Sequence, residues 1–368
     1  MRNLWLALLI GFAGIAGCYA NPVFIAEVDG RQVSLVDSGA AVSPDGRYAY
    51  WGSADGWIVK SDLQNRSQIA RVHIGKLVGA PSVSSDGRWV LAVDSRSRGL
   101  KLLDADLQPV LGYPAPQSPA KGAACISVAR DAPARRSFVI GCAGSSDLWE
   151  ISYDPNAGPI FDGLVHDYRN GEAISRPGFL GIRRTLLDIP MDDLFLESGS
   201  PYVLGLARLK DDSVEVVNLD IRRRVAPLAL SGQPHPGAAV AFQSKGTRMI
   251  AMPHGTKAVV SVIDIQTWRT TRVLNTPAPG VLLWSHPSSA YIWVSTPVDS
   301  AGKSTLTFVD KNTLAYAGAT QELTGTVDHV TFSHAGKYAV VRLSGRDNLR
   351  RVYDAYTLRQ VATVPIDP

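Results

Sequence analysis

The chain has 368 residues, of which 45% are hydrophobic and 19% are charged, and its formal net charge is +4. This composition can bury a core, and the length fits two ordinary domains or one large repeat array. A nucleic-acid-binding protein is not expected, because no run of Lys and Arg is dense enough to neutralise a series of phosphates.

The first residues predict an exported protein. After a positive start, the run 4–15 is almost wholly apolar, is too short to span a bilayer and has the proportions of a signal peptide. It ends in Ile15-Ala16-Gly17-Cys18, which has the form of a bacterial lipobox. We expect a lipoprotein signal segment at 1–18, a lipid on Cys18 as the only membrane attachment, and a periplasmic location. Cleavage after Ala20 without a lipid is the alternative, and it also exports the protein.

An internal repeat runs through the rest of the chain. One half is a turn followed by an apolar strand, as at 43–48 and 84–89, which read Ser-Pro-Asp-Gly-Arg-Tyr and Ser-Ser-Asp-Gly-Arg-Trp. The other half is an apolar strand that ends in an acidic residue. Its late copies at Asp264, Asp310 and Asp354 are 46 and 44 residues apart. This period is the length of a four-stranded propeller blade.

The repeat predicts an all-β fold, a single β-propeller of four-stranded antiparallel blades over residues 22–368. The 33 glycines and 23 prolines suit its many turns. Seven full repeats follow Ser43, and the segment 23–37 holds two further strands. Pairing these first strands with the C-terminal segment would close the ring and remove exposed edges. We therefore expect eight blades, with seven as the alternative.

Two cysteines remain after the signal segment, Cys125 and Cys142, and each belongs to an apolar run. The link between the runs is turn-like, so a hairpin folded about Pro133 and Ala134 would set the two cysteines opposite one another. An oxidising compartment then permits a cross-strand disulfide, with two separate buried thiols as the alternative. No C-x-x-C-H motif occurs, so no covalent c-type heme is expected.

The loops at a mouth of the central channel are where a propeller presents ligand-binding residues. Asp192 and Asp193 form a carboxylate pair suited to acid–base chemistry. Neighbouring residues of a strand point to opposite faces, so only one of the two can face the channel. Arg208, in the same expected blade, is predicted to pair with an acidic group of a ligand, with a surface ion pair as the alternative. No metal-ligand spacing is recognised, and no metal site is predicted.

A stiff histidine loop is the strongest site candidate. In Gly232-Gln233-Pro234-His235-Pro236-Gly237, two prolines fix the backbone of His235 just before the first strand of a blade. Its imidazole is predicted to ligate iron or carry a proton, with a hydrogen bond inside its own loop as the alternative. His254, in Met252-Pro253-His254-Gly255, is a second candidate. The remaining histidines belong to turns or lack a supporting pattern: His73, His166, His286, His329 and His334.

These loops carry a family resemblance. Residues 234–237, 252–255 and 285–287, the last followed by 291–294, resemble in order and spacing the heme d1 propeller of cytochrome cd1 nitrite reductase. The first third is more similar to NirF-type heme d1 biosynthesis proteins, on the stretches 45–50, 60–63 and 102–107. The resemblance covers most of 23–368.

The resemblance implies an eight-bladed propeller with a heme d1-type tetrapyrrole at the channel mouth. His235 matches a distal-side histidine of the reductase, and the reductase's second distal histidine falls near Asp192. The family's iron-ligating histidine before the first turn is missing, because 37–41 reads Asp-Ser-Gly-Ala-Ala. Without that ligand and without a c heme, nitrite reduction is not expected.

The sequence thus predicts a periplasmic NirF-like protein that binds heme d1 or a precursor. It would act in a late step of heme d1 biosynthesis, of oxidoreductase or lyase type, or in delivery to nitrite reductase. Asp192 and His235 are the predicted catalytic residues, and His235, His254 and Arg208 are the predicted cofactor contacts. Nitrite reductase and other heme d1 assembly proteins are the expected partners. The alternative is a cofactor-free scaffold for protein–protein interaction in the cell envelope, which the missing histidine favours.

Overall fold

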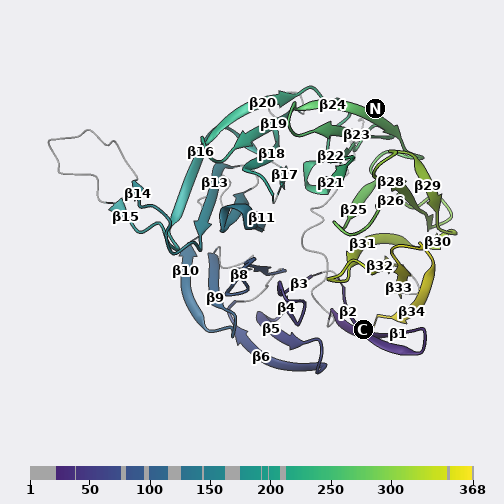
Figure 1. Ribbon diagram of the computed structural model, residues 1–368, viewed down its shortest axis with the longest axis horizontal. Helices are drawn as coiled ribbons and strands as arrows, with labels where there is room; N and C mark the ends of the chain where they lie inside the picture. Colours follow the sequence, from purple (N-terminus) through teal and green to yellow (C-terminus); the bar gives the residue numbers. More distant parts are fainter. Residues whose placement is uncertain are drawn as a thin grey trace, which may run out of the picture.

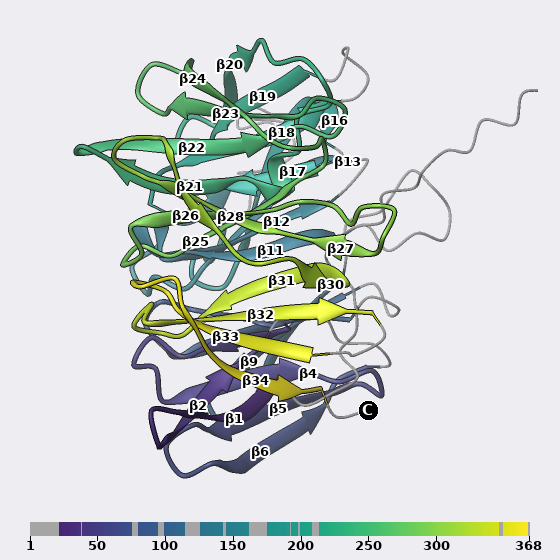
Figure 2. The ribbon, with the colours of Figure 1, turned by 90° about the vertical axis from the view of Figure 1, so that its right-hand side faces the viewer.

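The computed structural model describes residues 22–37, 39–75, 80–94, 99–114, 126–142, 145–161, 175–191, 193–197, 199–207, 213–345 and 349–366. Within these residues, seven four-stranded antiparallel sheets are arranged as the blades of a ring, which Figure 1 views along its axis. The side view in Figure 2 shows the strands running between the two faces of the ring. The signal segment with Cys18 lies outside the described residues.

Each blade has its first strand nearest the centre of the ring and its last strand at the outside (Figure 1). The first three blades are β3–β6 (Ala40–Val42, Tyr48–Gly52, Trp57–Asp62, Ser67–His73), β7–β10 (Ser82–Val83, Trp89–Asp94, Gly99–Asp104, Pro109–Pro114), and β11, β12, β13 and β16 (Ile126–Ala132, Ser137–Cys142, Ser145–Ser152, Ile182–Met191). The next four are β17–β20 (Asp193–Leu196, Tyr202–Ala207, Ser213–Asn218, Arg223–Leu228), β21–β24 (Val240–Ser244, Thr247–Pro253, Val259–Asp264, Arg269–Asn275), β25, β26, β28 and β29 (Leu282–Ser285, Tyr291–Ser295, Leu306–Asp310, Tyr316–Ala319), and β31–β34 (Thr326–Phe332, Tyr338–Ser344, Leu349–Asp354, Gln360–Pro365).

Short elements complete the described chain. They are the hairpins β1–β2 (Val23–Val28, Arg31–Val36) and β14–β15 (Ile160–Phe161, Ser175–Arg176), the pair β27–β30 (Lys303–Ser304, Leu323–Thr324), and the 3₁₀ turns η1 (Pro133–Arg135) and η2 (Pro236–Ala238). No helix in this part of the chain is long and apolar enough to cross a bilayer. Because η1 joins β11 to β12, the hairpin expected about Pro133 is confirmed. The disulfide stays a prediction, because Cys125 and the side chain of Cys142 lie outside the described part.

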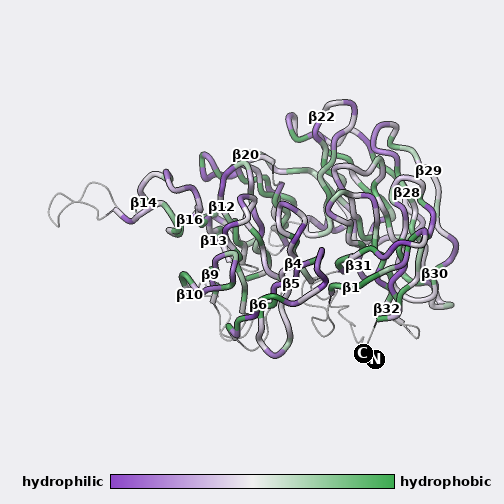
Figure 3. Tube along the Cα trace, turned by 60° about the horizontal axis from the view of Figure 1, so that its bottom comes forward, coloured by the Kyte–Doolittle hydropathy of each residue, from purple (hydrophilic) through white to green (hydrophobic). Residues whose placement is uncertain are grey.

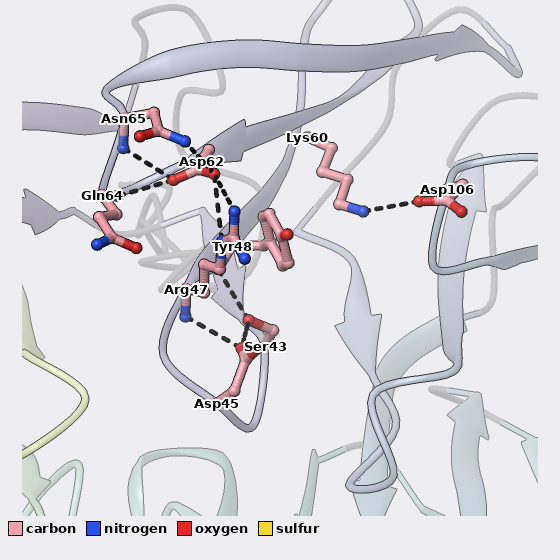
Figure 4. Close-up of polar contacts among 9 residues, drawn as sticks. All are labelled: Ser43, Asp45, Arg47, Tyr48, Lys60, Asp62, Gln64, Asn65 and Asp106. Atoms are coloured by element: carbon pink, nitrogen blue, oxygen red, sulfur yellow. Dashed lines mark hydrogen bonds and ion pairs between the residues drawn. The ribbon is translucent and has the colours of Figure 1, made fainter.

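The acidic residue of the repeat shapes the turn between the third and fourth strands. The Asp62 carboxylate accepts hydrogen bonds from the backbone amides of Gln64 and Asn65, both at 2.9 Å, and pairs with Arg47 at 3.2 Å (Figure 4). Four residues after the aspartate, Arg66 adopts a left-handed φ of 57° that reverses the chain. The same local bonds recur at the late copies of the repeat, where an aspartate accepts from the two amides that begin the turn: Asp264, Asp310 and Asp354. A side chain that bonds its own backbone in this way favours a turn over a continued strand.

Hydrophobic side chains between neighbouring blades form the core, and Figure 3 shows hydrophobic stretches distributed around the whole ring. Trp293 of the sixth blade is fully buried, and its ring lies 4.7 Å from that of Phe308 and 5.8 Å from that of Tyr353 in the seventh blade. Burying one such side chain contributes roughly 1.5–3 kcal/mol. Each blade is therefore stabilised mainly by its two neighbours.

The expectation of eight blades is wrong. The last four strands already form a complete blade, β31–β34, so the hairpin β1–β2 finds no further strands and stays a two-stranded sheet. Its apolar side, with Ala26 and Leu35, packs on Val340 and Val352 of the seventh blade. The inner turns of the seventh and first blades meet directly, because a Cβ added to Gly46 would lie 2.8 Å from the His334 ring. That contact leaves no room at the axis for another blade.

A buried ion pair fastens the hairpin to the last blade. Asp37 follows β2 and is 1% exposed, and its carboxylate accepts a 2.7 Å hydrogen bond from Nε of Arg350 on β33, which is 3% exposed. The Arg342 guanidinium lies 3.9 Å from the same oxygen. The pair joins residues from the two ends of the chain, so it closes the ring.

Replacing Asp37 should therefore weaken the closure of the ring and lower the stability of the protein. In Asp37→Ala the Arg350 guanidinium loses its buried partner, which costs about 3–5 kcal/mol in typical buried pairs. We expect a matching fall in the free energy of unfolding, measured by chemical denaturation followed by circular dichroism. Glu322→Ala is the control, because it removes a carboxylate from an exposed pair with Lys303 and should leave stability nearly unchanged. An equal fall in the free energy of unfolding in the two variants would contradict the role of Asp37 in closing the ring.

Candidate functional site

The loops that precede the first strand of a blade and the loops between its second and third strands emerge on the same face of the ring, because the strands alternate in direction. His235 belongs to the first kind of loop and His254 to the second. The structure joins the two loops through a β-bridge between Pro234 and His254 and a 2.9 Å hydrogen bond from the His235 amide to the Pro253 carbonyl. The two histidine loops found in the sequence therefore form one unit.

The His235 loop reaches the channel mouth. The turn η2, which starts directly after His235, contacts the innermost strands β17 of the preceding blade and β25 of the following one. The His235 carbonyl accepts a 3.2 Å hydrogen bond from the Ala238 amide, which tightens the turn. The His235 loop thus lies between the innermost strands of the two neighbouring blades, and the role predicted for His235 stays a prediction.

The His235 imidazole is half-buried, and its Nε2 lies 3.4 Å from Oδ2 of Asp193 at the start of β17. The same oxygen accepts a 2.9 Å hydrogen bond from the Gly237 amide, and Oδ1 accepts a 3.0 Å bond from the Leu194 amide. The structure thus pairs Asp193 with His235. Asp192 and Arg208 lie outside the described residues, so their predicted roles stay predictions.

His254 is 2% exposed, and both of its ring nitrogens have partners. Nδ1 lies 2.7 Å from the Ser231 carbonyl, which can only accept, so Nδ1 carries the proton. Nε2 then accepts from the Ser261 hydroxyl at 2.9 Å. Burial lowers the pKa of His254 because the charged imidazolium is the poorly solvated form. A bond from a nitrogen of this ring to a cofactor would require one of these hydrogen bonds to break, and the predicted cofactor contact stays a prediction.

Two basic side chains lie on innermost strands from opposite sides of the ring. Arg130 is on β11, the innermost strand of the third blade, and His329 is on β31, the innermost strand of the seventh. Burial lowers the pKa of His329; Asp37 opposes this shift, and the positive charges of Arg130 and Arg342 add to it. The Arg130 side chain is open to solvent yet enclosed by the surrounding blades, which lowers its pKa as well. An arginine still keeps its charge at neutral pH.

Sequence reasoning missed Arg130 and His329 as site residues, and it named Asp193 only as the neighbour of Asp192. The available signal was a charged or imidazole side chain in the first strand of a blade, where it borders the channel. His329 also packs edge-on against Trp284 of β25, with ring centroids 6.0 Å apart. His329 thus packs against the buried hydrophobic core at Trp284.

No group of three or more His, Cys, Asp or Glu that could hold a metal ion occurs in the described ranges. A polar cleft of about 420 Å³ lies away from the channel, at the rim between the third and fourth blades. Three of its charged residues, Arg135, Glu150 and Asp220, already pair with one another. We therefore assign the candidate site to the channel mouth rather than to this cleft.

These features define a seven-bladed β-propeller whose innermost strands and adjoining loops carry Arg130, His329 and His235. The family profile described as "Cytochrome D1 heme domain" matches residues 24–160 and 195–368. The chain belongs to the cytochrome d1 heme-domain family, and the resemblance seen in its sequence is confirmed.

Named relatives connect the family to heme d1 biosynthesis. The dihydro-heme d1 dehydrogenase of Pseudomonas aeruginosa is 34% identical over 331 residues, which cover 89% of this chain and 62% of the relative. Protein NirF of the same species is 25% identical, over 93% of this chain and 83% of its own. A solved structure of dihydro-heme d1 dehydrogenase NirN in complex with DHE is 30% identical, with a TM-score of 0.71, and the match covers 94% of this chain and 74% of that one. This chain thus spans less than two thirds of the curated dehydrogenase.

Acidification should destabilise the protein through protonation of the buried His254. The unfolded chain protonates His254 near its ordinary pKa of 6.5, whereas the folded protein holds that pKa lower. The stability that the neutral ring contributes is therefore present above pH 6.5 and lost as the pH falls toward the folded-state pKa. We expect the melting temperature of the unaltered protein to fall more than that of His254→Gln between about pH 7.5 and 5.5. Parallel losses in the two proteins would contradict this assignment.

Proposed function

We propose that this protein binds heme d1 or a heme d1 precursor at the channel mouth that carries His235. It would act in a late step of heme d1 biosynthesis or in delivery of the cofactor to nitrite reductase. The proposal includes export to the periplasm and a lipid anchor on Cys18. Family membership and the dehydrogenase and NirF relatives support a role in this chemistry.

The observation that carries the proposal is the positive charge enclosed in the channel. Tetrapyrroles of the heme class carry carboxylate side chains, and guanidinium groups bind carboxylates through charge-assisted hydrogen bonds. Arg130 and His329 lie on the innermost strands of opposite blades, β11 and β31. Enclosure by the blades strengthens such contacts, because the effective dielectric constant there is lower than in water. The residues present therefore fit an anionic macrocycle.

The chain's own residues have distinct tasks in this account. Arg130 and His329 hold and orient the anionic macrocycle, and His235 holds or moves a proton beside it. Asp192, His254 and Arg208 remain proposed contacts from the same face. When bound, the macrocycle would supply its redox-active iron. Dehydrogenation, the reaction that the name of the 34% identical relative denotes, is the reaction to assay on the bound macrocycle.

Titration of the purified protein with heme d1 and its dihydro precursor tests the proposal. Binding should shift the absorbance of the macrocycle. Arg130→Ala should weaken the affinity about ten- to a hundredfold, because a hydrogen bond to a charged group is worth about 1.5–3 kcal/mol. His235→Ala should weaken the affinity and alter the shifted spectrum.

Arg272→Ala is the matched control, because it removes the same charge from an exposed position on the outer strand β24. It should bind as the unaltered protein does. An unchanged macrocycle spectrum with every tetrapyrrole tried would contradict the proposal. It would favour the envelope scaffold, which the lack of a histidine in 37–41 already supports.

A further inference from the structure

We propose that Asp193 is a positioning residue for His235: it holds the imidazole in the form protonated on Nε2 and leaves Nδ1 as the proton-accepting nitrogen of the site. The inference rests on the proposed function for the role of that nitrogen toward a bound macrocycle. Its geometric part concerns the protein alone and is tested without a ligand.

Two backbone amides hold the Asp193 carboxylate in place independently of the His235 imidazole. Its Oδ1 accepts from the Leu194 amide at 3.0 Å, and its Oδ2 accepts from the Gly237 amide at 2.9 Å. Gly237 is required there, because an added Cβ would lie 2.3 Å from Oδ1. The loop that carries His235 is therefore locked to the neighbouring blade through the same carboxylate that faces the imidazole.

The chemistry of the pair decides where the proton lies. An ionised carboxylate can only accept hydrogen bonds, so the ring nitrogen facing it, Nε2 at 3.4 Å, is the one that carries hydrogen. Such contacts are often long in an unliganded site and shorten when the ligand arrives. In the neutral ring Nδ1 then has a free lone pair, and no hydrogen bond to it is found within the described part of the chain.

His254 provides an internal contrast on the same face. Its Nδ1 donates to the Ser231 carbonyl, so its neutral ring has the opposite tautomer, and its second nitrogen is occupied by Ser261. Of these two linked loops, only that of His235 offers an unoccupied basic nitrogen. This difference assigns the proton-handling role to His235 and a supporting role to His254.

The test uses the full soluble chain with nitrogen-15-labelled histidine, without and then with the dihydro heme d1 precursor. Two-bond nitrogen–proton correlation spectra report the tautomer of each ring, and His235→Gln identifies the signals of His235. We expect His235 to show the Nε2-protonated form in the unaltered protein and a mixture of tautomers in Asp193→Asn. Asp188→Asn is the control, because it removes a largely exposed carboxylate that pairs with Arg224, and it should leave His235 unchanged.

A second variant tests the same contact in case Asp193→Asn does not fold. Gly237→Ala keeps the carboxylate but forces it away from the loop, and it should produce the same mixture of tautomers with an intact circular dichroism spectrum. An Nδ1-protonated His235 in the unaltered protein, or a tautomer unchanged in both variants, would overturn the inference.

Adding the macrocycle separates the two hypotheses. A perturbed Nδ1 signal together with an absorbance shift supports both. If His235 shows the expected tautomer but the macrocycle shows no absorbance shift, the Asp193–His235 inference is supported and the proposed function is contradicted. An absorbance shift with an unperturbed Nδ1 signal overturns the role of that nitrogen while macrocycle binding stands.

Discussion

The site depends on how the ring closes. Asp37 and Arg350 come from opposite ends of the chain, and their buried 2.7 Å contact fastens the N-terminal hairpin to the last blade. At the axis, the turn of the first blade packs against His334 of the seventh. Each blade buries its hydrophobic faces against two neighbours, so a missing closure would expose the first and last blades. Both closing contacts must hold for the channel to exist as an enclosed space.

Closure also creates the chemistry of the channel. Arg130 and His329 are distant along the chain, and the ring places them on innermost strands where the charge of Arg130 helps to lower the pKa of His329. Asp37 belongs to the same electrostatic group, since its negative charge acts on His329. The residue that fastens the ring thus also adjusts the basicity of the site. In an open sheet the same side chains would be separated by solvent and screened by salt.

Much of the fold could be predicted from local patterns. The aspartates that end the third strands bond their own turn amides, as Asp310 and Asp354 do, so their spacing marked the blades in the sequence. The number of blades could not be predicted in this way, because the segment 23–37 has the strand pattern of a blade but only tertiary contacts show that it stays a hairpin. The His235 loop could be predicted as a site because the flanking prolines indicate a rigid backbone. Its partner Asp193 depends on the register of β17 across a blade boundary, which the sequence does not reveal.

The most direct measurement of the central claim is a crystal structure of the protein soaked or co-crystallised with heme d1. The account predicts the macrocycle in the axial channel, with carboxylates on Arg130 and with His235 at its face. A macrocycle seated in the rim cleft lined by Arg135 and Asp220, or on the outer strands, would contradict the account.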